Sequence, residues 1–78
     1  MTAVRVSDVT GWKRTDSGAL RKPVGDYVCH VQYDNSGRRW YWRVETRCSC
    51  PKRYAGSGVT HSRRMAQKRA VRRAREVQ

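Results

Sequence analysis

Large apolar side chains are scarce in this sequence, which has no Phe, no Ile and a single leucine, Leu20. Its longest apolar runs are a few residues, whereas a helix that spans a bilayer needs about 20. We therefore expect no membrane association. The 78 residues are enough for one small domain and exclude a large enzyme.

The scarcity of aliphatic residues means that valine, alanine, tyrosine and tryptophan must supply the core. A domain of this size gains only about 3–5 kcal/mol from one core. We therefore expect the three tryptophans, Trp12, Trp40 and Trp42, to be structural before they are functional.

Acidic residues are also few, since six Asp and Glu stand against 18 Lys and Arg, giving a formal net charge of +12. Such a charge opposes compaction by self-repulsion, which a polyanionic partner would relieve. Most of the basic residues are arginine, whose planar guanidinium binds phosphate through two parallel hydrogen bonds and stacks on bases. The start of the chain, Met1–Arg5, lacks the apolar stretch of a secretory signal, so a cytoplasmic location with reduced thiols is expected.

The clearest pattern is a β-hairpin, in which Tyr27–Tyr33 and Arg38–Thr46 alternate apolar and polar residues around a turn. With Asn35 and Ser36 at its tip, Val31 faces Trp40 and one face of the hairpin is apolar. A left-handed bulge in the turn would shift the pairing by one residue, but the apolar pattern favours the first register. The opposite face then presents His30, Gln32, Arg39, Tyr41, Arg43 and Arg47.

Residues 1–25 predict a poorly defined N-terminal arm or short strands. Leu20–Val24 is a candidate strand, and Pro23 restricts it to an edge or an end because proline donates no ladder hydrogen bond. The segment Arg47–Val59 contains one proline and two glycines, Gly56 and Gly58, and predicts a long basic connector.

Residues 61–77 predict a C-terminal helix, capped by Thr60 or Ser62. Small and apolar residues at helical spacing form one narrow stripe on it, namely Ala66, Ala70, Ala74 and Val77. The expected fold is a single α+β domain over residues 1–78. It has a three- or four-stranded antiparallel sheet with this helix packed on one face.

The candidate nucleic-acid contacts come from three segments. They are Arg39, Tyr41 and Arg43 on the sheet, Lys52 and Arg53 on the connector, and Arg63, Arg64, Lys68 and Arg72 on the helix. Arginine reads guanine and glutamine reads adenine when a sheet enters a major groove. The same hairpin face is also what the wet side of an ordinary antiparallel sheet would present.

Metal binding and catalysis have little support in the sequence. Cys48 and Cys50 form a C-x-C pair rather than the usual C-x-x-C of zinc sites, so no metal and no cofactor are expected. Cys29 is interpreted as a small core residue. The six carboxylates are scattered and neither His30 nor His61 has an evident acidic partner, so we expect no enzyme.

Two resemblances bear on the fold and function. The run Gly56-x-Gly58-x-Thr60-x-Ser62-Arg63-Arg64-Met65-Ala66-Gln67-Lys68-Arg69-Ala70 resembles the end of double-stranded RNA-binding domains. That resemblance implies that Arg63 and Arg64, followed by Lys68, contact phosphates. The first helix of that family has no counterpart in the pattern of residues 1–25.

A layout of three strands followed by a helix is similar to the arm-binding domains of tyrosine-family integrases and to plant ethylene-response DNA-binding domains. The helix start with Thr60, Arg63, Arg64 and Ala66 adds to this likeness. The resemblance implies a sheet inserted in the DNA major groove and a small phage or mobile-element protein. We therefore expect binding of double-stranded nucleic acid, with DNA favoured. The alternatives are binding of duplex or ribosomal RNA, and a phage-encoded interaction protein that acts on an acidic host protein.

Overall fold

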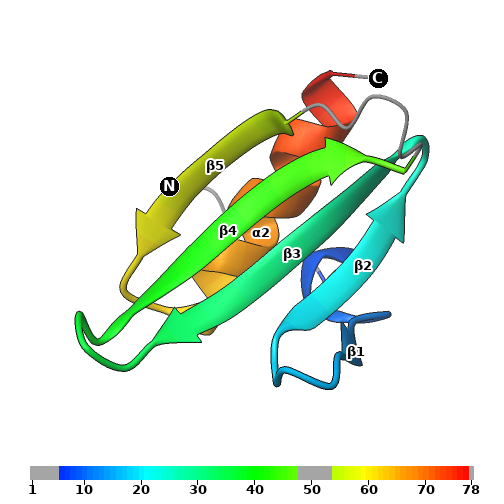
Figure 1. Cartoon of the computed structure of the whole chain (residues 1–78). Helices are drawn as coiled ribbons and strands as arrows, with labels where there is room; N and C mark the ends of the chain where they lie inside the picture. The colour runs from blue at the N-terminus through cyan, green and yellow to red at the C-terminus, as the bar shows by residue number, and fades with distance from the viewer. Residues whose placement is uncertain (1–5, 48–53, 78) are drawn as a thin grey trace.

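A computed structural model describes residues 6–47 and 54–77 of the chain. The elements in chain order are α1 (Val6–Val9), β1 (Lys13–Arg14), β2 (Leu20–Val24), β3 (Tyr27–Asp34), β4 (Arg39–Thr46), β5 (Tyr54–Thr60) and α2 (Arg63–Glu76). The strands form one antiparallel sheet in which every strand lies beside its neighbour in sequence (Figure 1). The expected α+β layout is confirmed, and the sheet has five strands rather than three or four.

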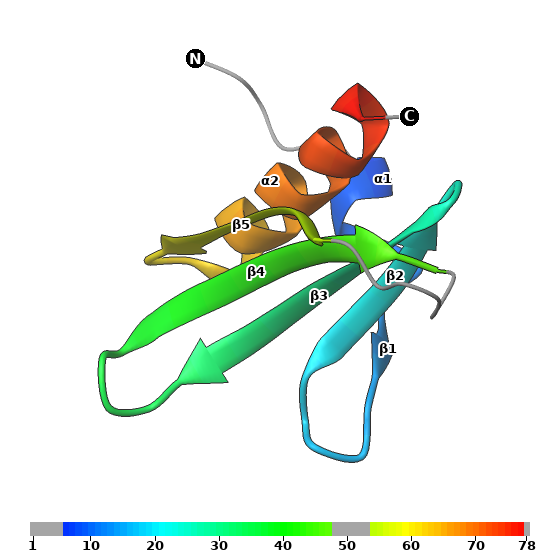
Figure 2. The same cartoon turned by 45° about the horizontal axis from the view of Figure 1, so that its top comes forward.

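Both helices lie on the same side of the sheet, with α2 crossing behind β3, β4 and β5 and α1 beside it (Figures 1 and 2). We call the other side the open face, because no described helix covers it. The open face is formed on the two central strands by the residues that alternate away from α2, namely Val28, His30, Gln32, Asp34, Arg39, Tyr41, Arg43 and Glu45.

The core lies between α2 and the inner side of the sheet. Cys29 and Val44, which pair across β3 and β4, are fully buried against Ala70 and Ala74 of the helix. Ala66 is fully buried as well, which confirms the small-residue stripe. Alanines let the helix approach the sheet closely, so a chain with few large aliphatic side chains still closes its core.

The hairpin of β3 and β4 has a different register from the one predicted. Val31 pairs with Trp42 rather than Trp40, a shift of two residues, and Trp40 pairs with Tyr33. The cause is a four-residue loop in place of a two-residue tip. Arg38 in this loop has a left-handed φ of 49°. Because side chains alternate with a period of two, a two-residue shift leaves the predicted faces unchanged.

β5 occupies part of the segment that the sequence predicts as a connector. That prediction is wrong from Tyr54 onward, while residues 48–53 lie outside the described part. The two glycines of β5 let neighbouring side chains lie close to the backbone, rather than allowing the chain to bend. A Cβ atom at Gly58 would lie 2.6 Å from Nε1 of Trp42, and one at Gly56 would lie 2.7 Å from Cγ of Arg73.

The N-terminal part begins with the short helix α1 where a strand or extended arm was expected. Trp12 Nε1 donates a hydrogen bond of 2.7 Å to the carbonyl oxygen of Asp8 and ties the end of α1 to the chain that follows. β1 pairs only with Leu20 and Arg21 of β2, so Pro23 lies at the edge of the sheet, as predicted. None of the described helices is long and apolar enough to cross a membrane.

Candidate nucleic-acid interface

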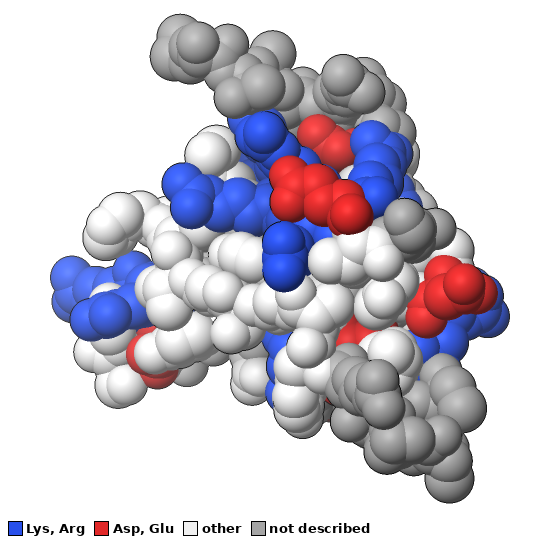
Figure 3. Space-filling view, turned by 90° about the horizontal axis from the view of Figure 1, so that it is seen from above, with Lys and Arg blue, Asp and Glu red and all other residues white. Residues whose placement is uncertain are grey.

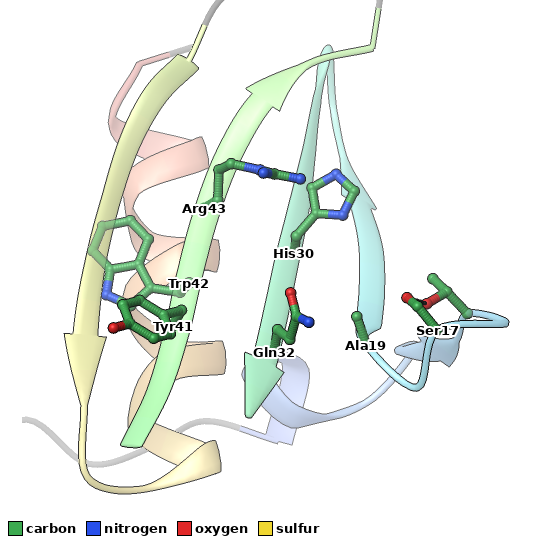
Figure 4. Close-up of a pocket in the computed structure, with 8 residues that line it drawn as sticks. Ser17, Ala19, His30, Gln32, Tyr41, Trp42 and Arg43 are labelled. Atoms are coloured by element: carbon green, nitrogen blue, oxygen red, sulfur yellow. Dashed lines mark hydrogen bonds between the residues drawn. The ribbon is translucent and has the colours of Figure 1, made fainter. Parts of the chain in front are cut away.

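The alternation of β4 brings three of the predicted contact residues to the open face. Arg39, Tyr41 and Arg43 lie about 7 Å apart along the strand, because two residues of an antiparallel strand rise about 6.8 Å. On β3, His30 pairs with Arg43 and Gln32 pairs with Tyr41, so both face outward as well (Figure 4). The sheet component of the predicted site is therefore assembled on one surface.

A carboxylate that the sequence analysis did not single out organises this surface. Glu45 has a side chain only 8% exposed, and its Oε1 lies 2.7 Å from Nε2 of His30. Its Oε2 lies 3.7 Å from Nε of Arg43. A buried carboxylate is costly unless it is paired, and these two partners on the open face supply the pairing.

Arg43 has a second contact, on the side of β5. Its guanidinium carbon lies 5.4 Å from the centre of the Tyr54 ring, within the range of a cation–π interaction. The Arg43 side chain is nevertheless about half exposed, at 49%. Contacts with Glu45 and Tyr54 thus restrain the guanidinium while leaving part of it accessible to a ligand.

His30 is a partly buried residue of the open face. Burial lowers the pKa of its imidazole from the ordinary value of 6.5, although the hydrogen bond and the charge of Glu45 act in the opposite direction. The neutral ring is therefore favoured at neutral pH, and it donates from Nε2 to the Glu45 carboxylate.

A hollow of about 300 Å³ opens on this face between the β1–β2 loop and the central strands. Thr15, Ser17 and Ala19 bound it on the loop side, and Figure 4 shows Gln32 and His30 on its other side. No described residue hydrogen-bonds the side-chain amide of Gln32, so both its donor and its acceptor are available. A surface of this kind can pair with polar edges such as those of nucleobases.

The predicted helix contacts lie elsewhere. Arg63, Arg64 and Arg72 are exposed on α2, on the opposite side of the sheet from Arg39, Tyr41 and Arg43. The structure therefore does not bring the two predicted groups into one site. Lys52 and Arg53 lie outside the described residues.

Lys68 differs from the surface contact that the sequence predicts, because it is only 8% exposed. Its neighbours Ala66, Gln67, Ala70 and Val71 on α2 are buried as well, so Lys68 lies on the packed part of the helix. Lys68 is therefore poorly placed to reach a phosphate.

Much of the remaining charge on α2 is engaged within the molecule. Glu76 accepts from Nε of Arg72 at 3.1 Å and lies 3.6 Å from Nη1 of Arg73. Arg73 Nε also donates to the Ala55 carbonyl oxygen at 2.7 Å, and Arg75 lies 4.0 Å from Asp8. Figure 3 shows acidic side chains among the basic ones at this end of the molecule.

Among residues 6–47 and 54–77, no three His, Cys, Asp or Glu side chains gather as they would around a metal ion. Cys48 and Cys50 lie outside these ranges. Cys29 is fully buried, which confirms its place in the core, and burial raises the pKa of its thiol to about 11. A thiol with so high a pKa is a poor nucleophile at neutral pH.

Two residues of this surface, Glu45 and Tyr54, were missed by sequence reasoning. Glu45 is the only acidic residue of β4 and shares a face with Arg43 two positions away, which is a signal that could have been used. Tyr54 carries no such signal, because its strand was not recognised.

Comparisons with protein-family models, curated proteins and solved structures find no match to this chain.

Proposed function

We propose that this protein binds double-stranded nucleic acid, with DNA favoured, through the open face of its sheet. The observation that carries the proposal is the row of Arg39, Tyr41 and Arg43 on an uncovered surface, flanked by His30 and Gln32. Glu45 is buried and committed to internal contacts. Asp34 lies opposite Arg39 at the end of the hairpin and accepts hydrogen bonds from Ser36. The accessible groups farther along the two central strands are basic, aromatic and amide.

The dimensions of the strand suit a groove. From Arg39 to Arg43 the chain advances about 14 Å at 3.4 Å per residue, and the DNA major groove is about 12 Å wide. Sheets and two-stranded ribbons are known to enter DNA grooves. The basic tip of the hairpin, with Arg38 and Arg39, would then approach a phosphate backbone while Arg43 faces base edges.

A second candidate is duplex RNA binding through the start of α2. It is favoured by Arg63 and Arg64, which are exposed side by side and form no ion pair with a described carboxylate. This surface is separate from the open face, so variants distinguish the two functions.

A cytoplasmic location suits either function and also suits the free, buried thiol of Cys29.

The test is a titration of DNA and RNA duplexes of matched length and sequence over a series of salt concentrations. The variant Arg39→Ala/Arg43→Ala should lower DNA affinity at least tenfold and reduce the salt slope by about 0.9 for each phosphate that is no longer neutralised. The matched control is Arg69→Ala/Arg72→Ala, which removes the same charge from α2 and should change affinity much less.

A salt slope near zero for both duplexes would refute nucleic-acid binding. Stronger binding of RNA that is lost in Arg63→Ala/Arg64→Ala, and retained in Arg39→Ala/Arg43→Ala, would establish the second candidate in place of the first. A loss of DNA affinity that is equal in the α2 control would show that net charge, rather than the open face, drives binding.

A further inference from the structure

A second hollow lies on the helix side of the molecule, away from the open face. It has a volume of about 310 Å³ and is bounded by the end of α1, the start of β2 and the first turns of α2. Its lining consists of Val9, Trp12, Leu20, Arg63, Arg64 and Gln67. DNA binding through the open face makes no use of this hollow, whereas the RNA-binding candidate would use its two arginines.

The electrostatics of this hollow are unusual for the start of a helix. The first turn of α2 has no acidic residue, and Arg63 and Arg64 stand there instead. The amino end of a helix carries a partial positive charge and favours anions, so two cations at this position are unfavourable. Neither arginine forms an ion pair with a carboxylate of the described chain. An anion in the hollow would relieve this repulsion.

Gln67 supplies an independent sign of a ligand. It is only 4% exposed and lines the hollow, and no described residue hydrogen-bonds its side-chain amide. The polar atoms of this amide open into the hollow, because among the described residues Trp42 Nε1 is the only side-chain nitrogen or oxygen that is sealed off without a partner. A ligand that offers both a donor and an acceptor would satisfy this amide.

The walls opposite the arginines are apolar. Val9, Trp12 and Leu20 contribute them, and the indole N–H of Trp12 is already used by the Asp8 carbonyl oxygen. The ring of Trp12 therefore presents carbon to the hollow rather than a donor. A phosphodiester backbone has no apolar group that would fill this part of the hollow.

We propose that this hollow binds the C-terminal residue of a peptide whose last side chain is apolar. The last residue carries three groups bonded to a single Cα atom, and each group matches one part of the lining. The carboxylate pairs with Arg63 and Arg64, the preceding amide pairs with Gln67, and the side chain packs against the apolar walls. Capture of a terminal carboxylate is a recurring mode of peptide recognition.

The test uses the full chain labelled with ¹⁵N and an acetylated tripeptide that ends in leucine with a free carboxylate. Binding should shift the backbone amide signals of Arg63 and Arg64 and the indole signal of Trp12. The same peptide with a C-terminal amide should bind at least tenfold more weakly. A peptide that ends in serine should also bind more weakly, because it cannot fill the space between the apolar walls.

The variant Arg63→Ala/Arg64→Ala should weaken binding of the free-acid peptide at least tenfold, and both positions are exposed, so the fold should be retained. Arg69→Ala/Arg72→Ala is the matched control for charge and should leave peptide affinity unchanged. Gln67→Leu keeps a side chain of similar size and should weaken binding, with the spectrum reporting whether the fold is intact.

Equal binding of the free-acid and amide peptides, or identical shifts with acetate alone at the same concentration, would overturn the proposal. Shifts at these positions caused by a nucleic-acid duplex but not by the peptide would assign the hollow to phosphate and also overturn it. Peptide binding does not depend on the open face, so the peptide assay and the duplex titration can fail separately.

Discussion

His30 on β3 and Glu45 on β4 are joined by a hydrogen bond of 2.7 Å that runs diagonally across the pair of strands. Their direct partners in the ladder are different, since His30 lies opposite Arg43 and Glu45 lies opposite Val28. The contact therefore links two rungs of the sheet and places a carboxylate beneath Arg43. It makes the open face a coupled polar network rather than a set of independent side chains.

The burial of His30 predicts a loss of stability in mild acid, although its contact with Glu45 acts in the opposite direction. The folded-state pKa of His30 lies below its ordinary value of 6.5, chiefly because of burial, so the unfolded chain binds the proton more readily. The stability that depends on neutral His30 is present above pH 6.5 and is lost as the pH falls through the folded-state pKa. Urea unfolding at several values between about pH 7.5 and 5 measures the effect.

The control for this experiment is His30→Gln, which should flatten the dependence on pH over that range. The charged groups that face His30 are Glu45, Arg43 and Arg21, and all three are unchanged in this variant. His61→Gln should retain the slope, because His61 is exposed and lies outside the network. An equal slope in His30→Gln and the parent protein would contradict the assignment.

Gly58→Ala should destabilise the fold by about 1–3 kcal/mol, the usual cost of forcing an added group into a packed site. The new Cβ would lie 2.6 Å from Nε1 and 2.8 Å from Cε2 of Trp42, and a rigid indole cannot move one atom alone. Urea unfolding measures the change. Ser57→Ala, on the exposed side of the same strand, is the control and should stay within about 0.5 kcal/mol. Similar losses in both variants would refute the packing argument.

Ser62→Ala should cost about 1 kcal/mol, because Ser62 Oγ accepts a hydrogen bond of 3.1 Å from the backbone N–H of Met65 and caps α2. Ser62→Asp keeps a cap and adds negative charge beside Arg63 and Arg64, so it should recover the loss and add about 0.3–1 kcal/mol. Thermal or urea unfolding at low salt measures both variants. If Ser62→Asp is no more stable than Ser62→Ala, the start of α2 is not short of negative charge.

Arg43→Lys tests the role of the restrained guanidinium in the proposed DNA binding. Lysine keeps the charge but loses the planar contact with Tyr54 and the paired hydrogen bonds to a base edge. The salt slope should stay the same, while discrimination against the wrong base pair should fall by about 1–3 kcal/mol. Binding to a set of duplexes with single base-pair changes measures it. Arg39→Lys is the matched control and should leave discrimination intact.

The periodic parts of the chain could be predicted from sequence. The hairpin of β3 and β4, the strand Leu20–Val24 and the alanine stripe all follow from alternation or helical spacing. The strand β5 could not be predicted, because glycine has low strand propensity. Gly56 and Gly58 are needed there because the side chains of Arg73 and Trp42 leave no room for a Cβ atom. The hairpin register depended on a loop with Arg38 in a left-handed conformation, which favours glycine over arginine.

The candidate site was predictable to the extent that it depends on one strand. Alternation in β4 groups Arg39 with Arg43, whatever the exact register. The burial of Lys68 depends on tertiary packing around α2, which a helical pattern does not report. The contact between Glu45 and His30 required the pairing between strands to be known, because His30 reaches Glu45 diagonally and not along one strand.

The order of the strands has a consequence for how the chain acquires its structure. Each strand pairs with the strand before it, so the sheet can extend by successive hairpins that join residues close in sequence, a topology associated with fast folding. Its inner side stays uncovered until α2, the last element that the structure describes, has been made. During synthesis Cys29 and Val44 therefore emerge before Ala70 and Ala74, and a ribosome-bound chain that stops before Arg63 exposes an unprotected apolar surface.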